Sequence, residues 1–346
     1  MSNKGKGIVL VTGANGYIAA STVEAFLNAG YSVRGTVRSK SSAISLLDAL
    51  SKHADHLEIV EVPDITVPGA FDEAVKGVTA IAHLAAPVSL TFADPEPVLK
   101  GAIEGTLRAL EAAHKEPSVK SFVLMSSIAA IASAKEGPYT FTESDWDEEA
   151  GANVAKLGKD APGGMIYQAS KTASEKTLWR FRDENKPSFT VTSVNPTFVA
   201  GPPVVVPSAA DSISPTTRII SSVYSGVPLG RAGIPGAYAG YVDIRDVARL
   251  VVFGVEHPDK ANNERFIAAS AYVLPQGVAD ILRREFPERA DIIEKGTPGE
   301  GYPLDFSFPK GGIVYDGTKA VRVTGQAYIP WEQTVLDTIA KLKPVL

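Results

Sequence analysis

The 346-residue chain contains no cysteine, and this absence removes several kinds of chemistry at once. Disulfide bonds, thiol nucleophiles and cysteine-ligated metal sites are all excluded. Histidine is scarce too: the five histidines (His53, His56, His83, His114 and His257) show no His-x-x-x-His or similar spacing. Because cysteine and histidine are the usual ligands of zinc, we expect no metal site.

The chain also lacks an excess of positive charge and any long apolar run. Lys and Arg together number 34 and Asp and Glu 39, which gives a formal net charge of −5. No basic surface for nucleic acid or an anionic membrane is therefore expected. No stretch approaches the roughly 20 apolar residues of a spanning helix, and the apolar run after residues 1–7 is too short for a signal peptide. We expect a cytoplasmic protein that binds neither nucleic acid nor membrane.

What the sequence does contain is a regular alternation of short apolar strands and helical patterns. Short runs rich in β-branched residues predict strands at 8–12, 31–37, 57–62, 80–84, 121–125 and 189–194. Helical spacing predicts helices at 17–29, 43–52, 70–76, 97–114 and 165–185. This alternation predicts an α/β fold with a doubly wound parallel sheet and helices on both of its faces.

A glycine-rich segment, Thr12-Gly13-Ala14-Asn15-Gly16-Tyr17-Ile18-Ala19, joins the first predicted strand to the first helix. Gly13 permits a tight turn, and Gly16 lets the backbone approach a pyrophosphate bound at the helix N-terminus. The pattern predicts a Rossmann-type dinucleotide site. The alternative is a plain strand–turn–helix with convenient glycines. The residues expected at the site are Thr12, Gly13, Asn15, Gly16, Tyr17 and Ile18.

The type of dinucleotide is indicated by the residues around the second strand. An NAD site usually has an acidic residue about 20 positions after the glycines, but residues 31–47 contain none. They contain Arg34, Arg38 and Lys40 instead. Arg38 lies where a 2′-phosphate would bind, and Arg34 shares its face of the strand. We therefore expect NADPH, although a solvated basic strand end is the alternative.

Later stretches break the alternation. Residues 134–165 are polar and acidic and are expected to form a surface loop with one helical turn. Residues 201–240 are rich in Pro, Gly and Ser, which is typical of a binding segment or lid. Helical patterns follow at 274–286 and 331–342. We expect residues 1–200 to form mainly the NADP-binding domain and residues 201–346 a smaller C-terminal substrate-binding lobe, with part of the later chain returning to the sheet.

Two groups of polar residues suggest proton-transfer chemistry. Tyr167 and Lys171 are four residues apart on a predicted helix and so share a face. An ammonium near a phenol lowers its pKa from about 10 and suits it to proton transfer. Ser126 and Ser127 end a predicted strand, where open α/β sheets bind ligands and a hydroxyl can donate to a carbonyl oxygen. The alternatives are a surface tyrosine above a solvated lysine, and serines that merely end a strand.

Taken together, these motifs resemble the extended short-chain dehydrogenase/reductase family. The matching residues are Thr12-Gly13-x-x-Gly16-x-x-Ala19, Asp64-Ile65, His83-Leu84-Ala85-Ala86-Pro87, Ser127, Tyr167-x-x-x-Lys171, Asn195-Pro196-Thr197 and Tyr241-Val242-Asp243-Ile244-Arg245-Asp246-Val247-Ala248. The run Arg34-Gly35-Thr36-Val37-Arg38 resembles the dihydroflavonol reductase-like branch. Within that branch the likeness is strongest to fungal NADPH-dependent carbonyl (aldehyde) reductases, and it covers nearly the whole chain.

The resemblance implies roles for individual residues. Tyr167 would donate a proton, Lys171 would lower its pKa and bind the nicotinamide ribose, and Ser127 would orient the substrate carbonyl. The further cofactor contacts would be Asp64 and Ile65 near adenine, Leu84, Ala85 and Ala86 along the cofactor backbone, Pro196 near the nicotinamide, and Lys40, Phe198 and Val199. One position departs from the family: Ala102 stands where an asparagine often precedes the Gly-Thr pair, so a proton relay through that asparagine is in doubt and water or backbone groups would replace it.

We therefore predict an NADPH-dependent reductase of small aldehydes or ketones, acting as a monomer or homodimer. The substrate pocket is expected near residues 88–92, 128–133 and 200–240, with Val88, Phe92, Ile128, Pro202, Val204 and Tyr224 as apolar lining. Two alternatives stay open. A nucleotide-sugar epimerase or dehydratase would retain NAD(H), against which the basic residues argue. An NADP-sensing regulator without turnover would not need a proton donor.

Overall fold

A computed structural model describes residues 5–87, 91–233 and 240–346 of the chain. The chain forms two compact units. The first, here called the sheet unit, comprises Met1–Ala134, Thr142–Asn195 and Ala248–Phe266, and the second unit comprises Lys135–Phe141, Pro196–Val247 and Ile267–Leu346. That the second unit binds the substrate stays a prediction.

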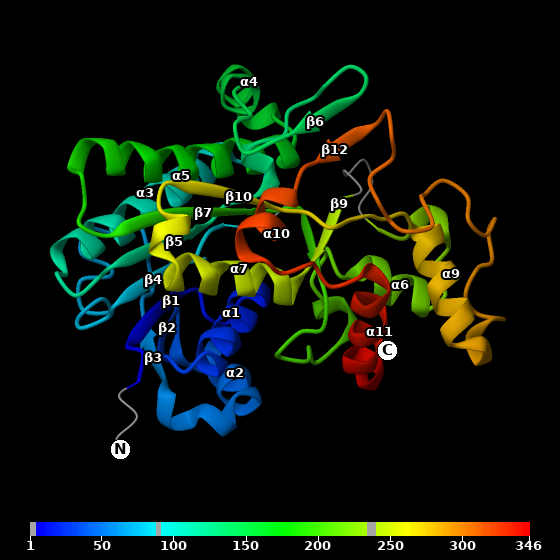
Figure 1. The fold of residues 1–346 in the computed structure, drawn as a ribbon, viewed down its shortest axis with the longest axis horizontal. Coiled ribbons are helices and arrows are strands. Elements are labelled where there is room, and N and C mark those ends of the chain that lie inside the picture. The colour runs from blue at the N-terminus through cyan, green and yellow to red at the C-terminus, as the bar shows by residue number, and fades with distance from the viewer. Residues whose placement is uncertain (1–4, 88–90, 234–239) are drawn as a thin grey trace. The chain divides into compact units, whose positions relative to one another are not determined.

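The sheet unit is built on a seven-stranded sheet with the strand order β10-β7-β5-β4-β1-β2-β3 (Figure 1). The strands are β1 (Ile8–Thr12), β2 (Ser32–Val37), β3 (Leu57–Glu61), β4 (Ala80–His83), β5 (Ser121–Met125), β7 (Thr190–Pro196) and β10 (Glu264–Ala268). The registers from β3 across to β7 are all parallel. The order reverses between β1 and β4, and such a switch point forms a ligand crevice at the carboxyl ends of the strands. The predicted Rossmann-type parallel sheet is confirmed.

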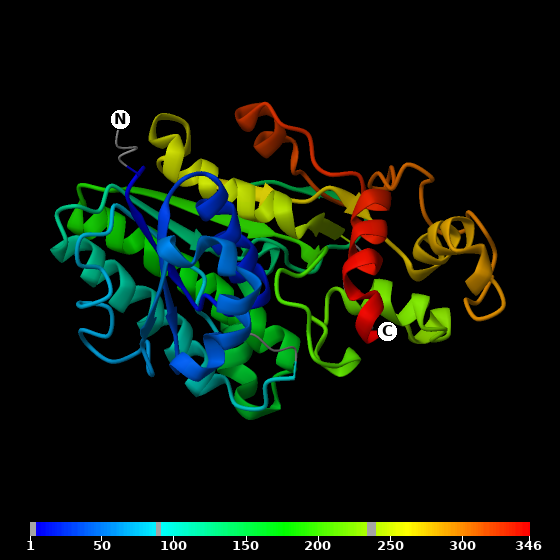
Figure 2. The same cartoon turned by 90° about the horizontal axis from the view of Figure 1, so that it is seen from below.

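Helices cover both faces of this sheet. α3 (Pro95–Lys115) and α5 (Gly163–Asn185) lie side by side on one face, whereas α1 (Tyr17–Asn28) and the C-terminal part of α7 (Ile244–Glu256) lie on the other (Figures 1 and 2). The Asp94 carboxylate caps α3 by accepting from the Glu96 amide at 3.1 Å. The shorter helices of this unit are α2 (Ile44–Ala49), α4 (Glu149–Leu157) and α8 (Pro258–Ala261).

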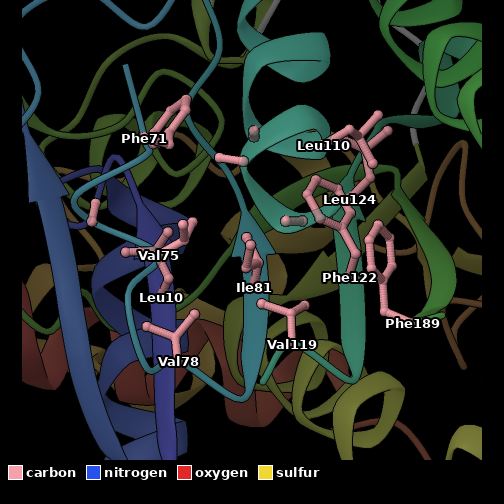
Figure 3. Close-up of a cluster of buried hydrophobic side chains, with 14 of the residues drawn as sticks. Leu10, Phe71, Val75, Val78, Ile81, Leu110, Val119, Phe122, Leu124 and Phe189 are labelled. Atoms are coloured by element: carbon pink, nitrogen blue, oxygen red, sulfur yellow. The ribbon is translucent and has the colours of Figure 1, made fainter. Parts of the chain in front are cut away.

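Buried apolar side chains fill the space between the sheet and the layer formed by α3 and α5. The labelled members in Figure 3 are Leu10, Phe71, Val75, Val78, Ile81, Leu110, Val119, Phe122, Leu124 and Phe189. On the opposite face of β1, Val9 and Val11 are also fully buried. Strands covered on both faces form continuous apolar runs rather than alternating ones, which is why the sequence locates them so well.

The described residues of the second unit form small sheets and several helices, besides the first residues of α7. β8 (Phe198–Ala200), β9 (Gly240–Asp243) and β11 (Ala271–Tyr272) form one sheet, and β6 (Tyr139–Phe141) pairs with β12 (Ile313–Tyr315). The helices are α6 (Arg218–Tyr224), α9 (Pro275–Glu285), α10 (Thr318–Thr324) and α11 (Trp331–Leu342). In the described part of the chain, no helix has the length and apolar character needed to cross a membrane.

Two predictions about local structure are wrong. Residues 70–76 form turns rather than a helix, and Gly69 and Gly77 on either side adopt left-handed backbone angles, with φ of +80° and +71°. Residues 134–165 are more than a loop, since they contain β6 and the nine-residue α4. Asp147 starts α4 by accepting from the Glu149 and Ala150 amides at 3.2 and 3.0 Å.

Candidate active and cofactor site

The three predicted catalytic residues meet at the carboxyl end of β5. Ser127 follows this strand by two residues, and its hydroxyl forms a hydrogen bond with the side chain of Tyr167 on α5. The Ser127 oxygen also accepts from the Ala129 amide at 3.1 Å. Lys171, one turn further along α5, donates from Nζ to the Met125 carbonyl at 3.2 Å and lies 5.9 Å from the centre of the Tyr167 ring. The structure thus brings Ser127, Tyr167 and Lys171 together.

Burial dominates the ionisation of this group. It lowers the pKa of the Lys171 ammonium to about 8, although the Glu175 carboxylate acts in the opposite direction. Burial raises the pKa of the Tyr167 phenol, and the hydrogen bond with Ser127 offsets this only in part. Removing water from the phenolate has the largest effect on Tyr167 here, and the expectation that Lys171 acts in the opposite direction stays a prediction. Tyr167 is protonated at neutral pH, which is the form a proton donor needs.

A buried carboxylate beneath the catalytic residues was missed by the sequence reasoning. Glu175 lies one turn after Lys171 on α5, and its side chain is 0% exposed. Its oxygens accept hydrogen bonds from Ser126, Asn195 and Arg265. The spacing Tyr167-x-x-x-Lys171-x-x-x-Glu175 was the available signal, since it extends the catalytic face of the helix by one turn.

The glycine loop forms a tight turn that leads into the uncapped N-terminus of α1. Gly13 adopts φ +67°, and a Cβ placed there would lie 3.1 Å from the Ala85 Cα. The Gly16 amide donates to the Gly13 carbonyl at 2.9 Å, and no side chain caps the helix that begins at Tyr17. Uncapped first-turn amides at the positive end of a helix favour an anion. Tyr17 and Ile18 occupy this first turn, and the Asn15 amide group donates to the Ser42 carbonyl at 3.2 Å.

Thr12 joins this loop to the segment after β4. The Thr12 hydroxyl accepts from the Leu84 and Ala85 amides, both at 2.9 Å, and lies 3.0 Å from His83 Nδ1. Because its two lone pairs are occupied, the hydroxyl proton points to Nδ1, which assigns His83 the neutral tautomer protonated at Nε2. Burial lowers the pKa of His83 to about 3, which is consistent with this assignment. Thr12 and His83 therefore hold the start of the 84–86 segment, which the resemblance places along the cofactor.

The basic residues after the glycine loop differ in their surroundings. Arg34 is engaged by the protein itself, since it donates to Glu58 at 2.7 Å and to the Ala74 and Lys76 carbonyls at 2.9 and 2.8 Å. The expectation that Arg34 assists a 2′-phosphate is therefore wrong. Arg38 is exposed and, within residues 5–87, 91–233 and 240–346, makes no hydrogen bond or ion pair.

Lys40 and Asp64 lie on loops that follow β2 and β3. The Lys40 side chain is exposed, and its backbone amide donates to the Glu61 carboxylate at 2.9 Å. Asp64 accepts from the Thr66 amide and hydroxyl at 2.8 and 2.7 Å, and these bonds lower its pKa. Ile65 packs against Gly105 of α3, where an added Cβ would lie 2.6 Å from Ile65 Cδ1. The sequence reasoning did not consider Glu61, which places a carboxylate beside Lys40.

The nicotinamide-side residues lie later in the chain. Pro196 ends β7, and Phe198 and Val199 belong to β8 of the second unit, paired with Tyr241 and Val242 of β9. Their contact with a cofactor stays a prediction.

The residues expected to line the substrate pocket differ in burial and packing. Val88 lies outside the described residues. Phe92 packs in a cluster with Ile166 of the sheet unit, and Ile128 begins a short 3-10 helix. Pro202 and Val204 are partly exposed. Tyr224 is wrong as a lining residue, because it is 4% exposed and packs edge-to-face on Phe286 at 5.4 Å within the core of the second unit.

Ala102, which stands where the resemblance implies an asparagine, lies on α3. It is buried, and its carbonyl accepts from the Thr106 hydroxyl at 2.9 Å. That hydroxyl also contacts the Ser174 hydroxyl of α5 at 2.8 Å.

The described residues contain no cluster of three or more acidic or histidine side chains suited to a metal ion.

The parallel sheet, the glycine loop and the Ser–Tyr–Lys group together define an extended short-chain dehydrogenase/reductase. The chain belongs to the NAD dependent epimerase/dehydratase family, because the sequence model of that family matches residues 9–269. The resemblance inferred from the motifs is confirmed.

Known relatives and solved structures fit this assignment. The chain is 42% identical over 200 residues to aldehyde reductase 2 of Sporidiobolus salmonicolor, covering 56% of this chain and 58% of that protein. It is 29% identical over 348 residues to the NADPH-dependent methylglyoxal reductase GRE2 of Saccharomyces cerevisiae, covering 96% and 97%. The crystal structure of yeast methylglyoxal/isovaleraldehyde reductase Gre2 complexed with NADPH matches with a TM-score of 0.83 at 28% identity, covering 97% of this chain and 98% of that one.

Proposed function

We propose that this protein reduces small aldehydes or ketones to alcohols with NADPH as the reductant. The observation that carries the proposal is the meeting of Ser127, Tyr167 and Lys171 at the carboxyl end of β5. Similar proteins that span nearly the whole chain are NADPH-dependent reductases. Fold alone would not decide the activity, but fold, site and relatives favour the same chemistry.

Each of the three residues has a distinct task. Ser127 lies within hydrogen-bonding reach of Tyr167, so a carbonyl oxygen between them receives donors from both sides. Tyr167 then transfers its phenolic proton to the oxygen as negative charge develops there. Lys171 supplies a positive charge on the same helix face, which stabilises the phenolate left behind. The raised pKa of Tyr167 keeps its proton in place until that moment.

The residues of the cofactor site suit NADPH. The glycine loop would hold the pyrophosphate, and Thr12 with His83 would hold the 84–86 segment beside it. Arg38 would bind the 2′-phosphate, since a guanidinium matches phosphate geometry. When bound, NADPH supplies the hydride for the carbonyl carbon. Asp64, Ile65, Lys40, Pro196, Phe198 and Val199 complete the proposed set of contacts.

The remaining features of the proposal concern partners and location. We propose a cytoplasmic enzyme that acts as a monomer or homodimer and binds no nucleic acid. The net charge of −5 supports the absence of a nucleic-acid partner.

The test is NADPH and NADH oxidation by the purified protein against a panel of aldehydes, ketoesters and aryl ketones. We expect turnover with NADPH at least about tenfold faster than with NADH, and its loss in Tyr167→Phe, because only the proton donor is removed. Tyr139→Phe, at an exposed tyrosine, is the matched control. NADPH binding without reduction of any carbonyl would refute the proposal and favour a nucleotide-sugar epimerase, a dehydratase or an NADP sensor.

A further inference from the structure

We propose that Glu175 is a positioning residue of the active site, which aligns the end of β5 with α5 and maintains the positive charge of Lys171. This inference rests on the proposed reductase function. Glu175 lies outside the residues that would touch the reacting atoms, and it is not among the cofactor-binding residues named above. Its geometry lies entirely within the sheet unit.

The hydrogen bonds around Glu175 all run in one direction. Oε2 accepts from the Ser126 hydroxyl at 2.6 Å and from Asn195 Nδ2 at 2.7 Å. Oε1 accepts from Arg265 Nε at 2.6 Å and from Trp179 Nε1 at 3.3 Å. Every partner donates, so the site is built for a group that only accepts, which is a carboxylate. A glutamine here would direct an NH2 group at other donors.

Arg265 supplies the opposite charge and is fixed on all sides. Its Nη1 donates to the Glu143 and Asp145 carbonyls, both at 2.7 Å, and its guanidinium lies 3.8 Å from the centre of the Trp146 ring. The side chain is 9% exposed. Removing one member of such a buried pair leaves the other charge buried and unpaired. Because Arg265 is held by these contacts, the pair can position Ser126 and Asn195, which donate to Glu175.

The Glu175 network ties three consecutive residues at the end of β5 to the catalytic helix. The Met125 carbonyl accepts from Lys171 Nζ, and the Ser126 hydroxyl donates to Glu175. The Ser127 carbonyl accepts from Asn195 Nδ2 at 3.2 Å, and the same Nδ2 group donates to Glu175. Because Ser127 and Tyr167 belong to these two elements, their mutual placement depends on this register.

Glu175 also acts on Lys171 through its charge. Around the Lys171 ammonium, α5 contributes Glu175 and Tyr167, β4 contributes the neutral His83, and β5 contributes the uncharged Met125 carbonyl. α3 meets α5 through the uncharged Thr106–Ser174 contact. Glu175 is therefore the one carboxylate among these neighbours, within the residues that the structure describes. Without it, burial alone would govern Lys171, whose pKa of about 8 would fall further.

The test compares wild type with Glu175→Gln, Glu175→Asp and the double variant Glu175→Gln/Arg265→Met. The double variant removes both charges, so it leaves no unpaired buried charge and serves if Glu175→Gln fails to fold. Glu184→Gln removes the same charge from an exposed position on the same helix and is the matched control. The readouts are kcat and KM with an aldehyde from pH 6 to 10, and the NADPH dissociation constant over the same range.

We expect Glu175→Gln and the double variant to lose about twofold in kcat at pH 7 and up to about tenfold at pH 9, with KM little changed, because a smaller fraction of Lys171 carries its charge. The alkaline fall in kcat and in NADPH affinity should move about one unit to lower pH in both variants. Glu175→Asp should keep the wild-type pH dependence, and Glu184→Gln should match wild type throughout.

Unchanged pH dependence in folded Glu175→Gln or in the double variant would overturn the proposal. A loss of kcat that is the same at every pH, and that Glu175→Asp shows as well, would also overturn it, because this is the pattern of a purely structural residue. If the wild type binds NADPH but reduces no carbonyl, the proposed function fails, while the pH dependence of NADPH binding still tests the role of Glu175 on its own.

Discussion

His83 makes the stability of the sheet unit depend on pH, because its imidazole is only 2% exposed. Burial, aided by the nearby Lys171 charge, lowers the pKa of His83 from 6.5 to about 3 in the folded chain. The unfolded chain therefore takes up the proton first as the pH falls. The stability contributed by neutral His83 is complete above about pH 6.5 and is lost progressively as the pH falls toward 3.

The size of this loss follows from the shift in pKa. Each unit is worth about 1.4 kcal/mol, so full titration would cost on the order of 5 kcal/mol. Between about pH 7.5 and pH 5 only the unfolded form of His83 titrates, which corresponds to a loss of about 2 kcal/mol in the free energy of unfolding. A loss of that size is a large part of the stability of a typical domain.

The assay is urea unfolding at both pH values for wild type and His83→Asn. Asparagine offers an oxygen to the Thr12 hydroxyl but does not titrate, and all other groups are common to both proteins. Trp146 and Trp179 lie in the sheet unit and Trp331 in the second unit, so unfolding is followed by fluorescence in a Trp331→Phe background of both proteins, which leaves only the sheet-unit tryptophans. The wild type should lose about 2 kcal/mol more than the variant. Equal losses in the two proteins would refute the reasoning.

Three further predictions concern the cofactor and the substrate. Gly13→Ala should weaken NADPH binding about tenfold, as measured by fluorescence titration. The left-handed backbone costs alanine about 1–2 kcal/mol, and the added Cβ would crowd Ala85. Unchanged affinity would contradict the assignment of the loop. Arg38→Ala should weaken NADPH binding about tenfold or more and leave NADH binding unchanged. Arg34→Ala, which breaks the ion pair with Glu58, should lower thermal stability without altering the preference for NADPH. The reverse pattern would exchange the roles of the two arginines. Ser127→Ala should lower kcat about 100-fold with NADPH affinity kept, and a kcat within threefold of wild type would exclude it as a carbonyl donor.

The sheet and the glycine loop were predictable because local sequence determines them. The runs that became β1 and β5 were located with their bounds, since strands buried on both faces are apolar throughout. The turn at Gly13 follows from its neighbours alone. Residues 70–76 show the limit of this approach: their apolar spacing is real, and Phe71 is fully buried, but the segment forms turns, so buried apolar spacing alone does not specify a helix.

The polar contacts of the site were predictable only where they lie close in sequence. Tyr167 and Lys171 share one helix, so their proximity follows from helical geometry. Glu175 and Arg265 are 90 residues apart, and nothing local to either one identifies the other as its partner. Arg34 was considered as a second contact of the phosphate for the same reason, because its partner Glu58 lies on the neighbouring strand, β3.

The precision of the proposed active site comes from buried polar groups rather than from the apolar core. Apolar packing is tolerant of small shifts, whereas a carboxylate with several directed donors holds one geometry. At the end of β5, the Ser126 amide donates to the Val194 carbonyl at 2.9 Å, its hydroxyl donates to Glu175, and the Ser127 carbonyl accepts from Asn195. The Ser127 backbone is thereby fixed before any substrate binds, and only its hydroxyl remains to respond to the carbonyl oxygen. A catalytic group that is aligned in advance loses little entropy in the transition state, so the cost of alignment is met by the fold of the sheet unit.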